Sequence, residues 1–490
     1  MSRQNLSAHP NHESFDALLS RPSEESSRWT GHWFDTAPST VSQISVTTST
    51  VTGKTATQTT TGTSPSPLSQ LTNAGIETDV AKLLVNNSLS YGAMLTILDD
   101  AVVGGMTASK FGTLQTLASL LNAHGGISTS TYVQDIAKSV ISGDPANATW
   151  TGGATNSVAL GNLTATSSQT QANELIGKWF LGTDLPSTSV SQIGEWGYNA
   201  AYQTTTNPLY GPSGSPSYLD VNQGYLGDCY FMSSIAEVAL QNPNAIQSMI
   251  TNNGNGSYGV RFFVNGQADY VTVNGALPNL PAGYAWANGS TLEFANGSVA
   301  WPALLEKAYA ELNTEPNAPH GATLNQAANS YAGIDAGGPY PLTEITGQAV
   351  TGFNLSARTS QAVLKSDLAQ IGSAWGAKQE LLVGTSFVSS GNVVGDHMYQ
   401  VVGFNASTGL LTLHNPWGSA YSGPLATTFT ESLAQLAGVY ASVYMTTGSP
   451  TTTASVAPTG HADHATVDAV MAHTSQQALL GSHANDLILS

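Results

Sequence analysis

The side chain best suited to covalent chemistry is Cys229, the single cysteine among 490 residues. Gly224 and Gly227 precede it, and the run that follows lacks Gly and Pro and carries Ile235 and Val238 at helical spacing. This pattern predicts a tight turn that places Cys229 in the first turn of a buried helix. A thiol at a helix N-terminus ionises more easily, and the thiolate is the nucleophile. Because a lone cysteine is more often a small buried hydrophobe, the interpretation depends on partners elsewhere in the chain.

Two such partners, His397 and Asn415, occur in one downstream segment. Alternating apolar residues run from His397 to Phe404 and again from Leu410, around an Asn-Ala-Ser-Thr-Gly turn, which predicts a β-hairpin. Pairing Phe404 with Leu410 places His397 opposite Trp417 and makes His397 and Asn415 diagonal neighbours on one face. An Asn amide can fix the tautomer of a histidine through its far nitrogen. Cys, then His, then Asn is the chain order typical of papain-like thiol proteases.

Four motifs in this order resemble the calpain family of cysteine proteases. They are Gln223-Gly-Tyr-Leu-Gly-Asp-Cys229, Trp301-Pro-Ala-Leu-Leu-Glu-Lys-Ala-Tyr-Ala310, Gly395-Asp-His397 and Asn415-Pro-Trp-Gly418. The resemblance extends over residues 200–449 and is to a bacterial-type member that lacks the penta-EF-hand region. It implies an α+β fold with a papain-like, two-lobed core, in which a helical lobe carries Cys and a β-rich lobe carries His and Asn.

The resemblance also implies a role for each residue of the candidate site. Cys229 is expected to be the nucleophile, His397 the general base and acid, and Asn415 the residue that orients His397. Gln223 and the Cys229 backbone N–H are expected to form the oxyanion hole. Trp417 is expected to shield the His–Asn pair from water.

These roles imply an endopeptidase that works through a thioester acyl-enzyme on a protein or peptide substrate, without a cofactor. Two alternatives remain open. One is a transglutaminase-like acyl transferase on the same triad, and the other is a non-catalytic secreted binding protein on a decayed protease fold. The intact Gln223, Cys229, His397 and Asn415 argue against decay.

Calcium is the metal that the resemblance brings into question, because calpains bind calcium ions within each lobe of the core. Asp220 matches one acidic position of the family, but its partner position is Val299, and Ser419-Ala-Tyr-Ser422 supplies no carboxylate after Asn-Pro-Trp-Gly. Calcium takes about six to eight oxygen ligands, several of them charged. We therefore expect no metal site, a core that works without calcium, and a structural part such as capping for Asp220 as a remnant.

Composition narrows the classes of partner. A formal net charge of −18 with only 13 Lys and Arg argues against nucleic acid and anionic membranes. One cysteine excludes an intrachain disulfide. No apolar run of about 18 residues occurs, so no membrane span is expected.

Five segments are expected from changes in composition. Residues 1–70 form a polar, Ser/Thr-rich segment and linker, 71–190 a small helical domain, 191–345 the Cys lobe, 346–449 the His/Asn lobe, and 450–490 a flexible tail. In the helical domain, Thr107 is expected to cap one helix and Ser128 or Thr129 another. This domain carries no cluster of catalytic residues. We expect it to act as an intramolecular pro-region or regulatory module, with a separate partner-binding domain as the alternative.

The two ends of the chain suggest export. The N-terminus lacks the apolar core of a secretory signal, and the C-terminal Asp486-Leu-Ile-Leu-Ser490 resembles the uncleaved signals of bacterial type I export substrates. A secreted protein is therefore expected, with a cytoplasmic location as the alternative.

Overall fold

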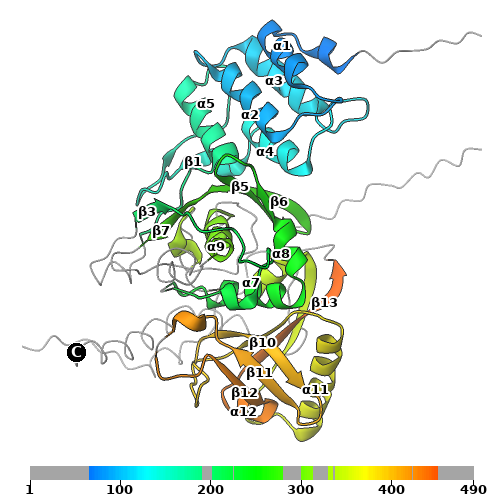
Figure 1. The fold of residues 1–490 in the computed structure, drawn as a ribbon, viewed down its shortest axis with the longest axis vertical. Helices are drawn as coiled ribbons and strands as arrows, with labels where there is room; N and C mark the ends of the chain where they lie inside the picture. Colours follow the sequence, from blue (N-terminus) through cyan, green and yellow to red (C-terminus); the bar gives the residue numbers. More distant parts are fainter. Residues whose placement is uncertain are drawn as a thin grey trace, which may run out of the picture. The chain divides into compact units, whose positions relative to one another are not determined.

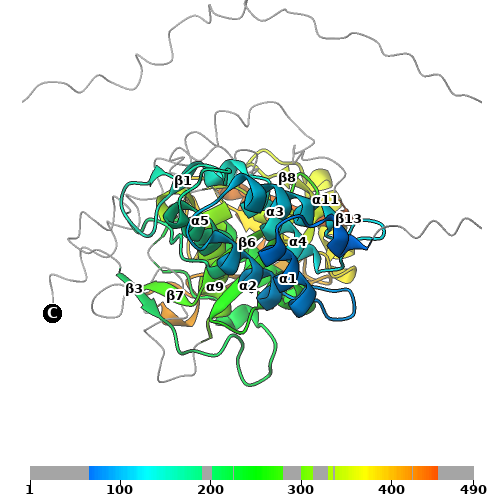
Figure 2. The same cartoon turned by 90° about the horizontal axis from the view of Figure 1, so that it is seen from above.

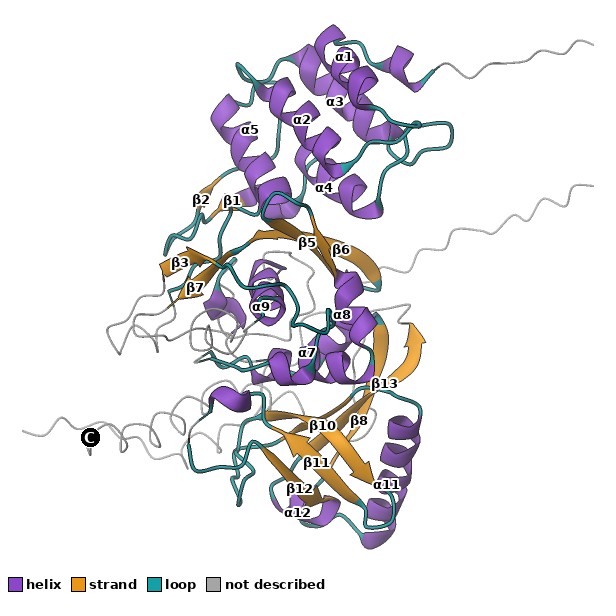
Figure 3. Ribbon diagram, in the orientation of Figure 1, coloured by secondary structure: helices purple, strands orange, loops and turns teal. Residues whose placement is uncertain are grey.

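The structure is a computed structural model that describes residues 66–189, 201–224, 226–279, 299–312, 329–334, 337–421 and 423–450. All of these residues belong to one unit that begins at Thr63. Helices and antiparallel sheets are both present, so the predicted α+β class is confirmed (Figures 1 and 3). The predicted linker before residue 66 and the tail after residue 450 lie outside the described residues. Among the described helices, none has the length and apolar character needed to cross a membrane.

Residues 67–181 form a bundle of helices, here called the helical unit. It contains α1 Ala74–Leu83, α2 Tyr91–Val102, α3 Ala108–Leu120, α4 Thr131–Ile141, α5 Gln169–Ile176 and the π-helical turn Gly177–Leu181. Helix α3 lies beside α4, as both views show (Figures 1 and 2). Thr107 caps α3 through its side chain as predicted, whereas α4 is capped by Ser130 instead of Ser128 or Thr129. The minor strands β1 Thr149–Trp150 and β2 Val158–Ala159 pair with each other.

Residues 201–346 form the Cys region, whose described residues include four α-helices and two small sheets. The helices are α7 Cys229–Gln241, α8 Pro243–Met249, α9 Trp301–Leu312 and α10 Tyr340–Thr346. The strands are β3 Ala201–Thr204, β4 Ile250–Asn252, β5 Ser257–Val264, β6 Gln267–Asn274 and β7 Ala276–Asn279. Phe231 of α7, Tyr309 of α9 and Phe262 of β5 meet in one apolar core, and the rings of Phe231 and Tyr309 stack 4.2 Å apart.

Residues 348–450 form the His region, a six-stranded antiparallel sheet in the order β12-β11-β10-β9-β13-β8. The strands are β8 Gln348–Asn354, β9 Leu381–Gly384, β10 Met398–Asn405, β11 Leu410–His414, β12 Thr428–Ser432 and β13 Ser442–Pro450. Helices α11 Gln361–Gly376 and α12 Leu433–Gly438 complete the region. Ile371 of α11 and Leu436 of α12 pack with Val401 and Leu411 of the sheet in a core of their own.

The helical unit contacts the Cys region through β5 and β6. The buried Tyr132 hydroxyl lies 2.8 Å from Thr272 Oγ1 of β6 and accepts a hydrogen bond from Asn253 Nδ2 at 3.0 Å. Gly259 of β5 allows this approach, because a Cβ there would lie 2.4 Å from the Tyr132 ring. Tyr91 of α2 adds a contact to Ser257 of β5 at 3.2 Å.

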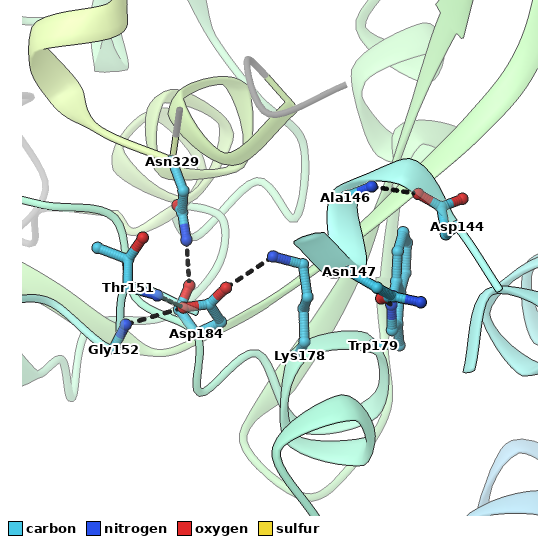
Figure 4. A network of polar contacts seen from close by, with 9 residues as sticks. All are labelled: Asp144, Ala146, Asn147, Thr151, Gly152, Lys178, Trp179, Asp184 and Asn329. Atoms are coloured by element: carbon cyan, nitrogen blue, oxygen red, sulfur yellow. Dashed lines mark hydrogen bonds and ion pairs between the residues drawn. The ribbon is translucent and has the colours of Figure 1, made fainter. Parts of the chain in front are cut away.

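A buried ion pair holds the chain where it leaves the helical unit (Figure 4). Lys178 Nζ donates to Asp184 at 2.7 Å, and the two side chains are 4% and 0% exposed. Asp184 also accepts from the backbone N–H groups of Thr151 at 2.6 Å and Gly152 at 2.8 Å. Asn329 of the Cys region donates to the Asp184 backbone carbonyl at 3.0 Å. These bonds connect three separate segments at one point.

Candidate active site

Cys229 lies at the position that its sequence context predicts. It is the first residue of α7, and the backbone N–H groups of Phe231 and Met232 donate to the Asp228 carbonyl at 2.8 and 3.0 Å as the first turn forms. Cys229 remains partly exposed, whereas the ten residues after it in the helix are buried. The thiol is therefore carried by a helix that its neighbours fix in the core.

The predicted hairpin forms from β10 and β11, with a difference in register. Phe404 pairs with Leu411 instead of the predicted Leu410. A β-bulge follows toward the site, and from Val401, which pairs with Leu413, the strands return to the predicted register. A bulge inserts one unpaired residue, so it compensates the one-residue error at the turn.

His397 and Asn415 meet at this end of the hairpin. His397 Nε2 lies 2.9 Å from Asn415 Oδ1, and both side chains are buried. Asn415 Oδ1 also accepts from the backbone N–H of Trp417 at 3.1 Å, which identifies this atom as the amide oxygen. Nε2 of His397 must then carry the proton, and Nδ1 is left as the acceptor. The Trp417 ring lies 5.0 Å from the His397 ring, centroid to centroid, and so covers the pair.

Met398, the neighbour of His397, connects this pair to α7. Its backbone donates a hydrogen bond to the Cys229 thiol, and its carbonyl accepts one from Ser233 Oγ at 2.8 Å. Ser233 is fully buried and lies one turn after Cys229 on the same face of α7. Ser233 is not among the residues that the sequence motifs predict for the site. Its spacing of four residues from Cys229 was the available signal, but a buried serine with this spacing is common in helices.

Desolvation shifts the pKa of both reacting groups, although part of the Cys229 residue reaches solvent. Burial raises the pKa of the Cys229 thiol to about 12; the Met398 backbone hydrogen bond opposes this and the charge of Asp228 adds to it. Burial also lowers the pKa of His397 to about 4, against the opposing hydrogen bond to Asn415. Desolvation thus opposes the effect of the helix N-terminus on this thiol, and the greater acidity expected for Cys229 stays a prediction.

Gln223 lies on the segment before Cys229 and contacts the Asn-Pro-Trp-Gly motif. Its backbone N–H donates to the Pro416 carbonyl at 2.7 Å, and its side-chain Nε2 donates to the Leu226 carbonyl at 2.6 Å. An amide Nε2 has two hydrogens, so one remains for a further acceptor. Gly418 is required nearby, because its φ is +64° and a Cβ there would lie 2.5 Å from the Val221 carbonyl oxygen.

Asp220 has a structural part, as the sequence analysis expected. Its carboxylate completes a capping box on the short 3-10 helix Tyr218–Asp220 by accepting from Ser217 N at 2.8 Å, and it accepts from Trp301 Nε1 at 2.8 Å. Val299 is buried. No group of three or more His, Cys, Asp or Glu side chains in the described ranges is arranged to hold a metal ion. The residues around Asp220 therefore do not fit a calcium site.

Comparison with known proteins places the same residues in one family. The family described as "Calpain family cysteine protease" matches residues 184–437, just over half of the chain. The matched range begins at Asp184 and contains Gln223, Cys229, His397 and Asn415. The helical unit precedes the match.

Individual relatives match the same part of the chain. "Calpain-type cysteine protease DEK1" of Zea mays is 31% identical over 232 residues, which is 43% of this chain and 10% of the relative. "Calpain-13" of Rattus norvegicus is 28% identical over 219 residues, 41% of this chain and 30% of the relative. "Calpain-2 catalytic subunit" of Gallus gallus is 28% identical over 222 residues, 42% of this chain and 29% of the relative. The similarity thus spans less than a third of each of these relatives.

Proposed function

The chain belongs to the calpain family of cysteine proteases, and on this premise we propose that it is an endopeptidase with Cys229 as its nucleophile. The observation that carries the proposal is the His397–Asn415 pair, with Nε2 of His397 bonded to Asn415 at 2.9 Å and Met398 bonded to the Cys229 thiol. Met398 follows His397 in the chain, so its bond to the thiol links Cys229 to the strand that carries the base. A general base held in one tautomer near a thiol is the arrangement that thiol catalysis requires.

The geometry supports a specific order of proton transfers. His397 Nδ1 accepts the thiol proton, which gives a thiolate–imidazolium pair, and the Cys229 sulfur attacks the substrate carbonyl. The free Nε2–H of Gln223 and the Cys229 backbone N–H stabilise the oxyanion. His397 then protonates the leaving amine, and water hydrolyses the thioester with His397 as base.

The finer fold assignment belongs to the same proposal. We infer a papain-like core of two lobes, the Cys region and the His region, because each has its own apolar core. The substrate would bind where α7 meets β10. The comparisons do not favour the transglutaminase-like or the non-catalytic alternative. Release of new N-termini, as opposed to isopeptide products, separates hydrolysis from acyl transfer.

The test of function uses Cys229→Ala and Cys229→Ser in the full chain. Peptide hydrolysis should fall by about 10³-fold or more in both variants, with unchanged circular dichroism. Ser234→Ala is the matched control, because Ser234 lies on the same helix and, within the described ranges, donates to the Tyr230 carbonyl at 2.7 Å, away from Met398. Substantial hydrolysis by folded Cys229→Ala protein would reject Cys229 as the nucleophile.

We propose that this activity does not depend on calcium. The support is that the Asp220 carboxylate is occupied by two N–H donors and that its expected partner position is an apolar valine. Hydrolysis should be the same in excess chelator and in millimolar calcium. A large gain with calcium that Asp220→Asn abolishes would contradict this.

We propose that the helical unit is a module that stays attached, in preference to a pro-region that is removed from the cleft. The support is the set of contacts to β5 and β6, which lie on elements other than those that carry Cys229 and His397. The intact chain should then hydrolyse peptides at a constant rate. Activity that appears only after cleavage between residues 66 and 190, followed by intact mass, would establish a zymogen.

Secretion remains a proposal that rests on composition and on the C-terminal Asp486-Leu-Ile-Leu-Ser490. Deletion of residues 450–490 should retain the protein in the producing cell. Unimpaired export of this truncated chain would reject the proposed signal.

A further inference from the structure

Two buried carboxyl groups meet directly behind Cys229. Asp228 precedes it in the chain, and Glu306 lies on α9; their side chains are 0% and 1% exposed. The two carboxyls are hydrogen-bonded to each other. The nucleophile is therefore adjacent to an acidic pair that no step of the proposed mechanism uses.

Asp228 is the N-cap residue of α7, but its side chain does not cap the helix in the usual way. An N-cap aspartate normally accepts a hydrogen bond from an N–H of the first turn, but the Asp228 side chain makes no such bond. Its backbone carbonyl begins the helix while its carboxyl bonds to Glu306. The start of α7 is thus attached to α9 through this side chain.

A proton must lie between the two groups, since two carboxylates cannot donate to each other. Across the described residues, no N–H or hydroxyl group donates to either Glu306 carboxyl oxygen, which leaves the Asp228 carboxyl as the group bonded to it. Burial raises the pKa of Glu306 well above its ordinary range, and the charge of Asp228 raises it further. The two carboxyls therefore share a proton and titrate as a unit.

We propose that Glu306 is a positioning residue for Cys229, acting through a proton that it shares with Asp228. This deepens the proposed function, because it takes Cys229 as the nucleophile. Without Glu306, the Asp228 carboxyl loses its hydrogen bond to α9, which weakens the attachment of the first turn of α7. A small displacement of a nucleophile costs a large part of the rate.

The groups around the pair limit what a pH experiment can report. Tyr331 and Tyr202 face Glu306, and burial raises the pKa of both hydroxyls well above the ordinary value. Asp396 and Tyr399 face the thiol, and burial also raises the pKa of Tyr399. The tyrosines therefore stay neutral between pH 5 and 10 and do not contribute to a pH profile in this range. Variants of Asp228 and Glu306 then show how much of the profile is due to the acidic pair.

The first experiment measures kcat and KM for peptide hydrolysis in the full chain. Glu306→Met should lower kcat by about tenfold or more with KM within about twofold, as for a misplaced nucleophile. Glu306→Gln should restore most of the loss, because its amide donates to Asp228 without a shared proton. Glu344→Met is the matched control, since Glu344 is a fully buried acid on α10. Parental kcat in folded Glu306→Met protein, or an equal loss in Glu344→Met, would overturn the proposal.

The second experiment needs no peptidase activity. Alkylation of Cys229 by iodoacetamide is followed by intact mass between pH 5 and 10. Asp228→Asn removes the negative charge beside the thiol, so its profile should move to lower pH by about one unit, whereas Glu306→Gln keeps the parental profile. An unmoved Asp228→Asn profile would overturn the proposal, even if Glu306→Met fails to fold. A shift in a chain that hydrolyses no peptide would reject the proposed function and retain this inference.

Discussion

The helices of the helical unit and those of the Cys region are built differently. Each of α1 to α5 begins with a side chain that accepts an N–H bond of its first turn; these are Asn73, Ser90, Thr107, Ser130 and Ser168. None of these five described helices buries a charged side chain. In the Cys region, α7, α8 and α10 have no side-chain cap. Buried charged groups of that region include Glu237, Glu306, Lys307, Glu311 and Glu344.

This difference in helix capping and buried charge indicates that the helical unit is built for stability and the Cys region for chemistry. Each N-cap side chain stabilises its helix by about 1 kcal/mol, and the apolar residues of these helices add stability by packing in the core. Buried ionisable groups cost free energy unless they are paired, and they are concentrated around functional sites. We therefore expect substitutions in the Cys region to change activity before stability, and substitutions in the helical unit to do the reverse.

After replacement of Cys229 itself, the largest effect is expected from Gln223→Ala. Loss of one oxyanion donor should lower kcat by roughly 10²–10³-fold with little change in melting temperature. Alkylation of Cys229 should stay close to the parental rate, because Gln223 acts on the oxyanion. If alkylation and turnover fall together, Gln223 instead has a structural part through its bond to the Leu226 carbonyl.

The free energy of unfolding should fall in acid because His397 is buried in its neutral form. The folded pKa is about 4 and the ordinary value is 6.5, so the unfolded chain takes up this proton first. The stability contributed by neutral His397 is complete above pH 6.5 and is lost as the pH falls toward 4, to a total of about 3 kcal/mol. Urea unfolding at several pH values should show this slope in the parent and lack it in His397→Gln. Equal slopes would indicate a solvated histidine.

Ser233→Ala should have an intermediate effect of about tenfold on kcat/KM. The substitution removes the bond from Ser233 Oγ to the Met398 carbonyl, which holds β10 against α7. Ser234→Ala, on the same helix, is the control that should retain the parental rate. Identical rates in both variants would show that the remaining packing aligns Cys229 and His397 by itself.

The smallest effect on activity is expected from Tyr132→Phe in the helical unit, which should instead lower stability. It removes the bonds to Thr272 and Asn253, and the free energy of unfolding should fall by about 1 to 3 kcal/mol. Tyr270→Phe is the control, because its hydroxyl bonds to Thr131 at an exposed position and should matter little. A tenfold change in kcat/KM for Tyr132→Phe would show that the helical unit is coupled to the site.

Sequence reasoning succeeded where a local pattern determines the structure. The start of α7 was predicted from the glycines before Cys229 and the helical spacing after it. The contact between His397 and Asn415 was predicted from the alternation of apolar residues in the two strands. Sequence reasoning erred at Phe404, because the bulge that sets the register has no distinct local signal. Cap residues near Ser130 were ambiguous, since Ser128 and Thr129 have the same capping chemistry.

Features that depend on packing between distant parts of the chain could not be predicted from local sequence patterns. The acidity of Cys229 is set by its burial, which involves residues far along the chain. Glu306 stood within a motif of the sequence analysis, yet nothing local indicates that its carboxyl meets that of Asp228. Only the folded chain shows which ionisable groups share the interior.

The central claim is that Cys229 forms a thioester with the acyl part of the substrate. The direct measurement is rapid acid quench of the full chain mixed with an N-acyl amino acid p-nitrophenyl ester, followed by peptide mapping. The account predicts a burst of about one nitrophenol per chain and an acyl group on Cys229, both absent in Cys229→Ala. Peptide hydrolysis at parental rate with no acyl group on Cys229, or with the group on another residue, would contradict it.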